Sequence, residues 1–441
     1  IIIGGSTFLQ TAGPDSDLDI IFIFPQKCIC PNYLNNCEKC QKNKNFNFCT
    51  KHELFFGSNE KSFALHLKKE INNLKTIKEF EINGYSLSGS YINSIENARV
   101  PIISILISQI EMDIMACPIP FDNIPNDFDL INIENEIKIN KNLNLFNKLI
   151  KIMIKQNEQF YNKNILVLTG YRIAYQIKSK FIQPKFQLLF INLMRSVKLW
   201  AKKKQIYSNI FGYLSGTILI IMVAKINLKY SNGGLNFLLK QFFEVYSEWQ
   251  WPFPVMIEPL TNEKEFTYLN EENNLIKSWN FSNISEQQMP IISPNFPEQN
   301  VAFNINEFTK NIIIREMKKA SDLIKNNKSI NKNSEWWQKI LFKPINYKQI
   351  YKHFILIICT VPNKITENLN NYNGKFTCGL LKTKLRIILK LWALNEINLE
   401  EYHAISGFEK ERKCERKGYL FFNFFMLVYT YVKHYCNIDS F

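Results

Sequence analysis

Hydrophobic runs separated by turn residues predict strands in the first part of the chain. Residues 20–24 form an apolar, β-branched run that ends at a proline, as a buried strand does. Two further runs, 100–107 and 110–116, are separated by a two-residue connection of hairpin length. Residues 62–74 carry apolar side chains at helical spacing. This mixture predicts an α/β arrangement for residues 1–140.

The hydrophobic pattern becomes helical after about residue 150. Apolar residues recur along residues 186–204, for example, with lysines among them. Near the end of the chain, strand-like and helix-like runs alternate over 354–361, 380–393 and 419–432. We therefore expect three domains, at residues 1–140, 141–345 and 346–441.

Three acidic residues stand out against these apolar runs. Residues two apart in a strand point to the same face, so Asp17 and Asp19 are predicted to project side by side. Asp113 lies within the otherwise apolar run 110–116, where a carboxylate is costly unless it is paired or bound to a metal. A divalent cation would neutralise the repulsion between such acids, and oxygen ligands of this kind suit Mg²⁺. The simpler alternative is a hairpin with two solvated acids.

Glycine-containing turns precede the acid pair. Gly5 and Ser6 form a turn whose backbone N–H groups and hydroxyl can hold a phosphate, and Gly13 belongs to a second turn. A glycine-serine turn, a second glycine turn and an acid pair follow one another in that order. The order favours a phosphate and metal site over the solvated hairpin.

In order and spacing, these residues resemble the polymerase-β-type nucleotidyltransferases, and in detail the eukaryotic poly(A) polymerases. The resemblance continues along nearly the whole chain, for instance in 198–202, 206–209, 212–216, 249–255 and 289–294. It implies an α+β multi-domain fold. The expected parts are a polymerase-β-like mixed-sheet nucleotidyltransferase domain, a helical central domain and an RRM-like C-terminal domain.

The resemblance also implies an activity, namely template-independent addition of AMP from ATP to the 3′ end of RNA. Asp17, Asp19 and Asp113 would then be the catalytic residues and the ligands of two Mg²⁺ ions, with Mn²⁺ as an alternative. Lys198 would neutralise charge on the departing pyrophosphate. The nucleotide contacts that the resemblance implies are Gly4, Gly5, Ser6, Gly13, Lys198, Tyr207, Gly216 and Thr217.

The charge balance agrees with a nucleic-acid partner. The chain has 54 Lys and Arg against 39 Asp and Glu, a net charge of +15, which favours binding to a polyanion such as RNA. No signal for lipidation or a membrane span stands out, so we expect no membrane partner. The family further implies a monomer, RNA 3′-end processing factors as partners, and a nuclear location. Because the chain begins at Ile1, shortly before Gly5, we also expect that its native N-terminus is missing.

A cluster of cysteines follows the first predicted strand. Cys28, Cys30, Cys37 and Cys40 have a spacing that would suit a structural zinc ion, although the poly(A) polymerase pattern has no metal there. The alternative is an insertion with free thiols.

Two other functions are compatible with the sequence. One is a related terminal transferase of other base preference, because base selection depends on a pocket shape that the three acids do not report. Thr169, moreover, replaces an asparagine that lies near the nucleotide sugar in the family. The other is a catalytically silent RNA-binding scaffold. The intact acids and Lys198 argue against the scaffold, since a silent protein has no need of clustered like charges.

Overall fold

The structure is a computed structural model in which the chain divides into two compact units, each described here by itself. The first unit comprises Ile1–Ile191, Ile257–Trp279 and Ser293–Gln299, and the second comprises Asn192–Met256, Asn280–Ile292 and Asn300–Phe441. The described residues are 1–13, 16–25, 55, 62–74, 91–95, 100–107, 110–121, 123–124, 136–155, 159–261, 278–326, 337, 341–351, 353–362, 384–385, 387, 399–408 and 419–431. The predicted zinc ligands Cys28, Cys30, Cys37 and Cys40 lie outside them. The division into three domains stays a prediction.

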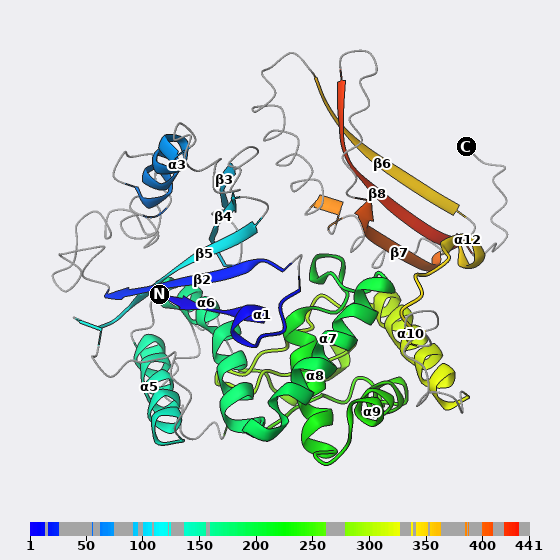
Figure 1. Cartoon of the computed structure of the whole chain (residues 1–441), viewed down its shortest axis with the longest axis horizontal. Helices are drawn as coiled ribbons and strands as arrows, with labels where there is room; N and C mark the ends of the chain where they lie inside the picture. The colour runs from blue at the N-terminus through cyan, green and yellow to red at the C-terminus, as the bar shows by residue number, and fades with distance from the viewer. Residues whose placement is uncertain are drawn as a thin grey trace. The chain divides into compact units, whose positions relative to one another are not determined.

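A five-stranded mixed sheet forms the centre of the first unit (Figure 1). Only β2 and β5 pair in parallel, and the other neighbours are antiparallel. The sheet confirms the predicted mixed α/β character, and the antiparallel pairing of β4 with β5 confirms the predicted hairpin. In spatial order the strands are β1 (Ile2–Ile3), β2 (Leu18–Pro25), β5 (Ile110–Ile119), β4 (Ile102–Ile107) and β3 (Tyr91–Ile95).

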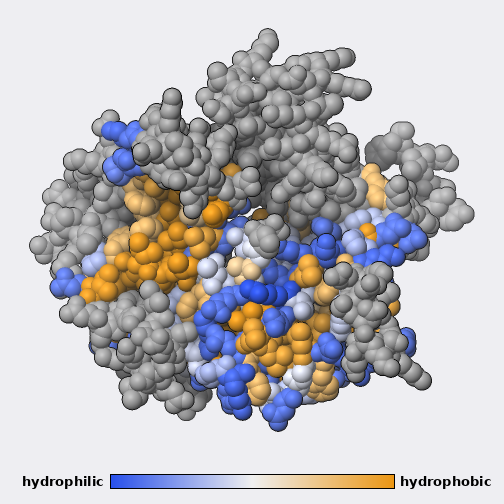
Figure 2. All heavy atoms as spheres, viewed as in Figure 1, coloured by the Kyte–Doolittle hydropathy of each residue, from blue (hydrophilic) through white to orange (hydrophobic). Residues whose placement is uncertain are grey.

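Helices cover both faces of this sheet, which explains why β2 is apolar at every position from 20 to 24. Ile21 and Ile23 pack into one cluster with residues of α5 (Glu136–Lys155) and α6 (Gln159–Gln176). The alternate residues of β2 pack into a second cluster with α3 (Phe63–Leu74). A strand buried on both faces needs hydrophobic residues at every position. Hydrophobic residues accordingly gather over this sheet in Figure 2.

Two short elements of the first unit matter for the site. The one-turn helix α1 (Gly5–Phe8) lies between β1 and β2 in the chain. Helix α6 continues into a π-helix, η4 (Ile177–Phe181), which is followed by the 3₁₀ turn η5 (Pro184–Phe186). The next helix, α7 (Gln187–Lys203), begins in the first unit and continues into the second.

The second unit contains the helices α7, α8 (Gly216–Lys229), α9 (Leu235–Ser247) and α10 (Glu307–Lys325). Trp200 of α7 is fully buried and meets Phe243 of α9 with ring centroids 4.8 Å apart. The hydroxyl of Tyr246 donates to the carbonyl of Met222 at 2.8 Å. The four helices confirm the helical character predicted for this part of the chain, and these contacts show that they pack against one another. The unit also has the short elements η6 (Asn209–Phe211), η8 (Phe281–Glu286) and α12 (Tyr347–Ile350).

A separate antiparallel sheet lies near the end of the chain. It has the order β6-β8-β7 and consists of β6 (His353–Pro362), β8 (Tyr419–Tyr431) and β7 (Leu399–Phe408). The strands β6 and β8 confirm the strand-like character of 354–361 and 419–432. An RRM-like fold for this part of the chain stays a prediction.

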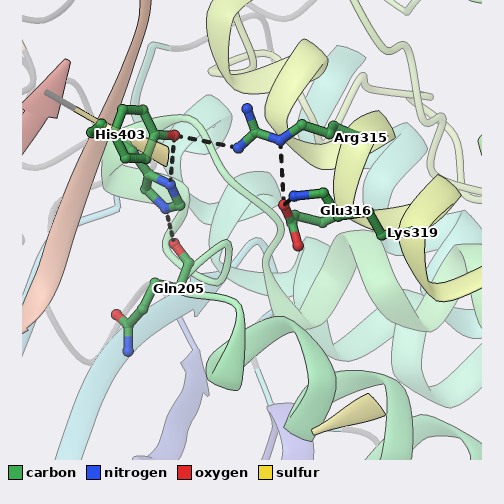
Figure 3. A network of polar contacts seen from close by, with 6 residues as sticks. Gln205, Arg315, Glu316, Lys319 and His403 are labelled. Atoms are coloured by element: carbon green, nitrogen blue, oxygen red, sulfur yellow. Dashed lines mark hydrogen bonds and ion pairs between the residues drawn. The ribbon is translucent and has the colours of Figure 1, made fainter. Parts of the chain in front are cut away.

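A buried histidine links this sheet to the helices of the second unit (Figure 3). In the neutral imidazole of His403, Nε2 donates to the carbonyl of Gln205 at 2.9 Å, because a carbonyl oxygen only accepts. The other nitrogen, Nδ1, then accepts from the hydroxyl of Tyr351 at 3.3 Å, and Arg315 donates to that hydroxyl. Arg315 also contacts the buried carboxylate of Glu316. The hydrogen bonds therefore run in one direction, from Arg315 to Gln205.

Within the described parts of the chain, no helix is long and apolar enough to cross a membrane.

Candidate active site

Two of the three predicted acids are brought together by the register of the first sheet. Asp19, the second residue of β2, pairs with Asp113 of β5 in parallel. Paired residues on neighbouring strands project from the same face, and the strands run about 4.8 Å apart. Asp17 stands one residue before β2 and is exposed. The three carboxylates thus belong to one end of β2 and the adjoining part of β5.

The Asp113 carboxyl shows the electrostatic effect of this arrangement. Burial raises its pKa from 3.8 to about 6, a hydrogen bond from the Ser104 hydroxyl opposes the rise, and the charges of Asp17 and Asp19 add to it. Ser104 is the direct antiparallel partner of Asp113 on β4. The ionised form of Asp113 is therefore costly in the metal-free protein.

A divalent cation fits this set of oxygen donors, because its charge would offset the burial and the carboxylate repulsion that raise the pKa of Asp113. In their present side-chain positions, however, the described residues contain no group of three or more His, Cys, Asp or Glu arranged to hold a metal ion. The three acids as a complete ligand set therefore stay a prediction.

The predicted glycine-serine turn lies against Asp19. The Gly4 N–H donates to the Asp19 carbonyl at 2.9 Å. Gly5 has a φ of +57°, and a Cβ built on it would overlap the Asp19 carboxylate. Only glycine fits at this position, for both reasons. On the other side of the turn, the Ser6 carbonyl accepts from the Thr11 N–H at 2.8 Å. The turn at Gly5 therefore packs directly against Asp19 of β2.

The second predicted glycine has a different setting. The Gly13 N–H donates to the Ser16 hydroxyl at 2.9 Å, immediately before Asp17. A Cβ at Gly13 would meet its nearest atom, the Ser16 hydroxyl, only at 4.0 Å. Gly13 thus shapes the approach to the acid pair, and its direct contact with a nucleotide stays a prediction.

Four further predicted residues lie in the second unit, and at least three of them are neighbours. Lys198 of α7 is buried, and its ammonium lies 5.8 Å from the centre of the Tyr207 ring. A Cβ built on Gly216 would lie 3.3 Å from the Tyr207 hydroxyl. Gly216 is the first residue of α8 and Thr217 the second. Lys198, Tyr207 and Gly216 therefore lie close together, and their contact with a nucleotide stays a prediction.

Sequence patterns did not predict two residues that lie near the three acids and the Gly5 turn. Ser104 could have been found, since it is the one polar residue of an isoleucine-rich strand and the short hairpin connection sets it opposite Asp113. Lys178 could not, because its hydrogen bond to the Phe8 carbonyl joins residues 170 positions apart.

A pocket of about 370 Å³ lies in the first unit, apart from these residues. It is lined in part by Gln176, Lys180, Glu258 and Asn295, which hydrogen-bond in series. Its described lining includes none of the predicted site residues.

Sequence comparisons show that the chain is similar to known poly(A) polymerases. Residues 189–344 match the family model of the poly(A) polymerase central domain. Poly(A) polymerase PAPa of Candida albicans is 25% identical over 329 residues, which make up 74% of this chain and 51% of the relative. Poly(A) polymerase pla1 of Schizosaccharomyces pombe is 24% identical over 416 residues, 93% of this chain and 58% of the relative. The chain is thus similar in sequence to poly(A) polymerases over most of its length.

This kinship confirms the resemblance that the motifs indicated. The chain spans about half the length of the curated poly(A) polymerases it matches. Among solved structures, a crystal structure of the Cid1 poly(U) polymerase matches with 14% identity and a TM-score of 0.39, covering 78% of this chain and 85% of the other. A likeness of that degree is too distant to carry an argument about substrate.

Proposed function

We propose that this chain is a polynucleotide adenylyltransferase that adds AMP from ATP to the 3′ end of RNA without a template. The observation that carries the proposal is the pairing of Asp19 with Asp113, with Asp17 beside them and the Gly5 turn resting on Asp19. The kinship with poly(A) polymerases supports this reading of the site.

Asp17, Asp19 and Asp113 would hold Mg²⁺, or Mn²⁺ in its place. When bound, the metal would promote attack of the RNA 3′-hydroxyl on the α-phosphate of ATP and stabilise the pyrophosphate that leaves. The raised pKa of Asp113 agrees with a site whose ionised form a bound cation would stabilise.

The remaining predicted residues would bind and orient the nucleotide. Backbone N–H groups of the turn at Gly5 and Ser6 would hold phosphate oxygens. The Lys198 ammonium would neutralise the developing charge on the pyrophosphate. The Tyr207 hydroxyl would donate to a phosphate or the sugar. Gly4, Gly13, Gly216 and Thr217 complete the proposed nucleotide contacts.

Partners and location follow from the same proposal. The net charge of +15 supports RNA as the polyanionic partner. The three-stranded antiparallel sheet β6-β8-β7 would be part of an RRM-like RNA-binding domain. We further infer a nuclear monomer that works with RNA 3′-end processing factors. A zinc ion at Cys28, Cys30, Cys37 and Cys40 stays a prediction from their spacing.

The test is a tailing assay with the purified chain, a short RNA primer and each ribonucleoside triphosphate in turn, with Mg²⁺. We expect ATP-dependent extension that Asp19→Asn reduces by at least a thousandfold, because the metal loses a charged ligand. Glu111→Gln, an exposed change on β5 that also removes a carboxylate, should retain activity.

Other outcomes identify the alternatives. Extension with UTP in preference to ATP would replace the proposal with a terminal transferase of other base preference. RNA binding without extension by any nucleotide would indicate a silent scaffold.

A further inference from the structure

Lys178 of the π-helix η4 contacts the C-terminal end of α1, the short helix that begins with the proposed phosphate-binding residues Gly5 and Ser6. The Lys178 ammonium donates to the Phe8 carbonyl at 3.0 Å and lies 4.8 Å from the centre of the Phe8 ring. Phe8 is the last residue of α1, and Gly5 and Ser6 are its first two. A cation at the C-terminal carbonyls of a helix is favourably placed.

The Phe8 side chain packs on two buried tyrosines. Its ring lies 5.1 Å from the ring of Tyr171 and 6.1 Å from that of Tyr175, both of which are buried in α6. Asn142 of α5 donates to the Tyr175 hydroxyl at 3.2 Å. The C-terminal end of α1 is thus held by Phe8, whose ring packs on α6 and whose carbonyl accepts from Lys178 of η4.

The near end of α1 is fixed to the sheet. The Gly4 N–H donates to the Asp19 carbonyl at 2.9 Å, and Gly5 fits closely over the Asp19 carboxylate. The turn is therefore held at both ends, by β2 on one side and by η4 on the other.

The charge of Lys178 is costly where it lies. The side chain is half-buried, and burial lowers the pKa of its ammonium. Leucine or methionine would pack over Phe8 without losing hydration. By contrast, Lys180, two residues further on, is exposed and forms an ion pair with Glu258. The hydrogen bond from the Lys178 ammonium to the Phe8 carbonyl offsets part of the cost at position 178.

We propose that Lys178 is a positioning residue that holds α1 against Asp19, so that the turn at Gly5 and Ser6 is already ordered when the triphosphate arrives. The inference rests on the proposed function. A turn that had to be ordered during binding would bind ATP more weakly, because the ordering opposes association.

Two substitutions at position 178 separate the charge from the packing. Lys178→Met keeps a flexible apolar stem and loses the donor, whereas Lys178→Arg keeps both. Lys180→Met is the matched control, since it removes the same charge from the same π-helix without touching Phe8. We expect Lys178→Met to raise KM for ATP roughly tenfold, as loss of a charged hydrogen bond can, with a much smaller change in kcat and in KM for the RNA primer. Lys178→Arg should restore KM to within about threefold of the original value.

Amide hydrogen exchange across residues 4–11 measures the same effect without an enzymatic reaction. Lys178→Met should speed exchange there at least severalfold, while Lys180→Met should not. An unchanged KM for ATP, an equal rise in KM for RNA, or unchanged exchange in Lys178→Met would overturn the inference. If the unsubstituted chain transfers no nucleotide, the proposed function fails, and the exchange measurement still decides whether Lys178 orders the turn.

Discussion

Asp113→Asn should stabilise the metal-free protein while abolishing nucleotide transfer. The pKa of the Asp113 carboxyl rises from 3.8 to about 6 on folding, so ionised Asp113 opposes folding at neutral pH. At about 1.4 kcal/mol per pKa unit, the penalty is roughly 3 kcal/mol. Asparagine removes the charge and can still accept the hydrogen bond from Ser104, but it remains a buried polar group. We therefore expect a net gain of about 1–2 kcal/mol, or roughly 2–8 °C in Tm for a unit of this size.

The sign of the pH dependence gives this prediction a second test. The folded-state pKa lies above the unfolded value, so the proton on Asp113 stabilises the fold fully below about pH 4, and that stability is lost as the pH rises through 6. The advantage of Asp113→Asn should consequently be largest at pH 7.5 and small at pH 5.

The assay is thermal and urea unfolding in EDTA at pH 7.5 and pH 5, repeated at pH 7.5 with Mg²⁺. Added Mg²⁺ should stabilise the original chain and close most of the gap to Asp113→Asn, because a ligand of the folded state stabilises it. Glu111→Gln, at an exposed position two residues away, should change stability by less than about 0.5 kcal/mol. A variant less stable than the original chain in EDTA, or a gap equal at both pH values, would refute the reasoning.

Two other substitutions test the local geometry. Gly5→Ala should destabilise the first unit by about 1–3 kcal/mol and impair transfer, because alanine disfavours the positive φ and its Cβ has no room, whereas Gly13→Ala should cost clearly less in urea unfolding. His403→Phe should destabilise the second unit by about 1–3 kcal/mol, because the Gln205 carbonyl loses its donor and the Tyr351 hydroxyl its acceptor. A phenylalanine variant as stable as the original chain in the same assay would contradict this account of the buried histidine.

The sequence predicts which residues of the site form strands better than it predicts the register in which those strands pair. Alternation of side chains assigns Asp19 and Asp113 to faces of their strands, but a parallel pair has no short turn to fix its register. Only two residues join β4 and β5, and a connection that short sets an antiparallel register, which is why the position of Ser104 could have been predicted. The contact of Lys178 with Phe8 could not be predicted from local sequence patterns. This contact depends on a π-helix and on tertiary packing, neither of which leaves a local pattern.

The close fit of Gly5 over Asp19 affects how substitutions at the site should be interpreted. Truncating Asp19 to alanine would remove a proposed ligand and also the surface against which the turn is built, so a lost activity would mix two causes. Asparagine keeps the shape and isolates the charge. The shape of the side chain at position 19 and the absence of one at position 5 are therefore coupled, and only substitutions that keep both test the charge alone.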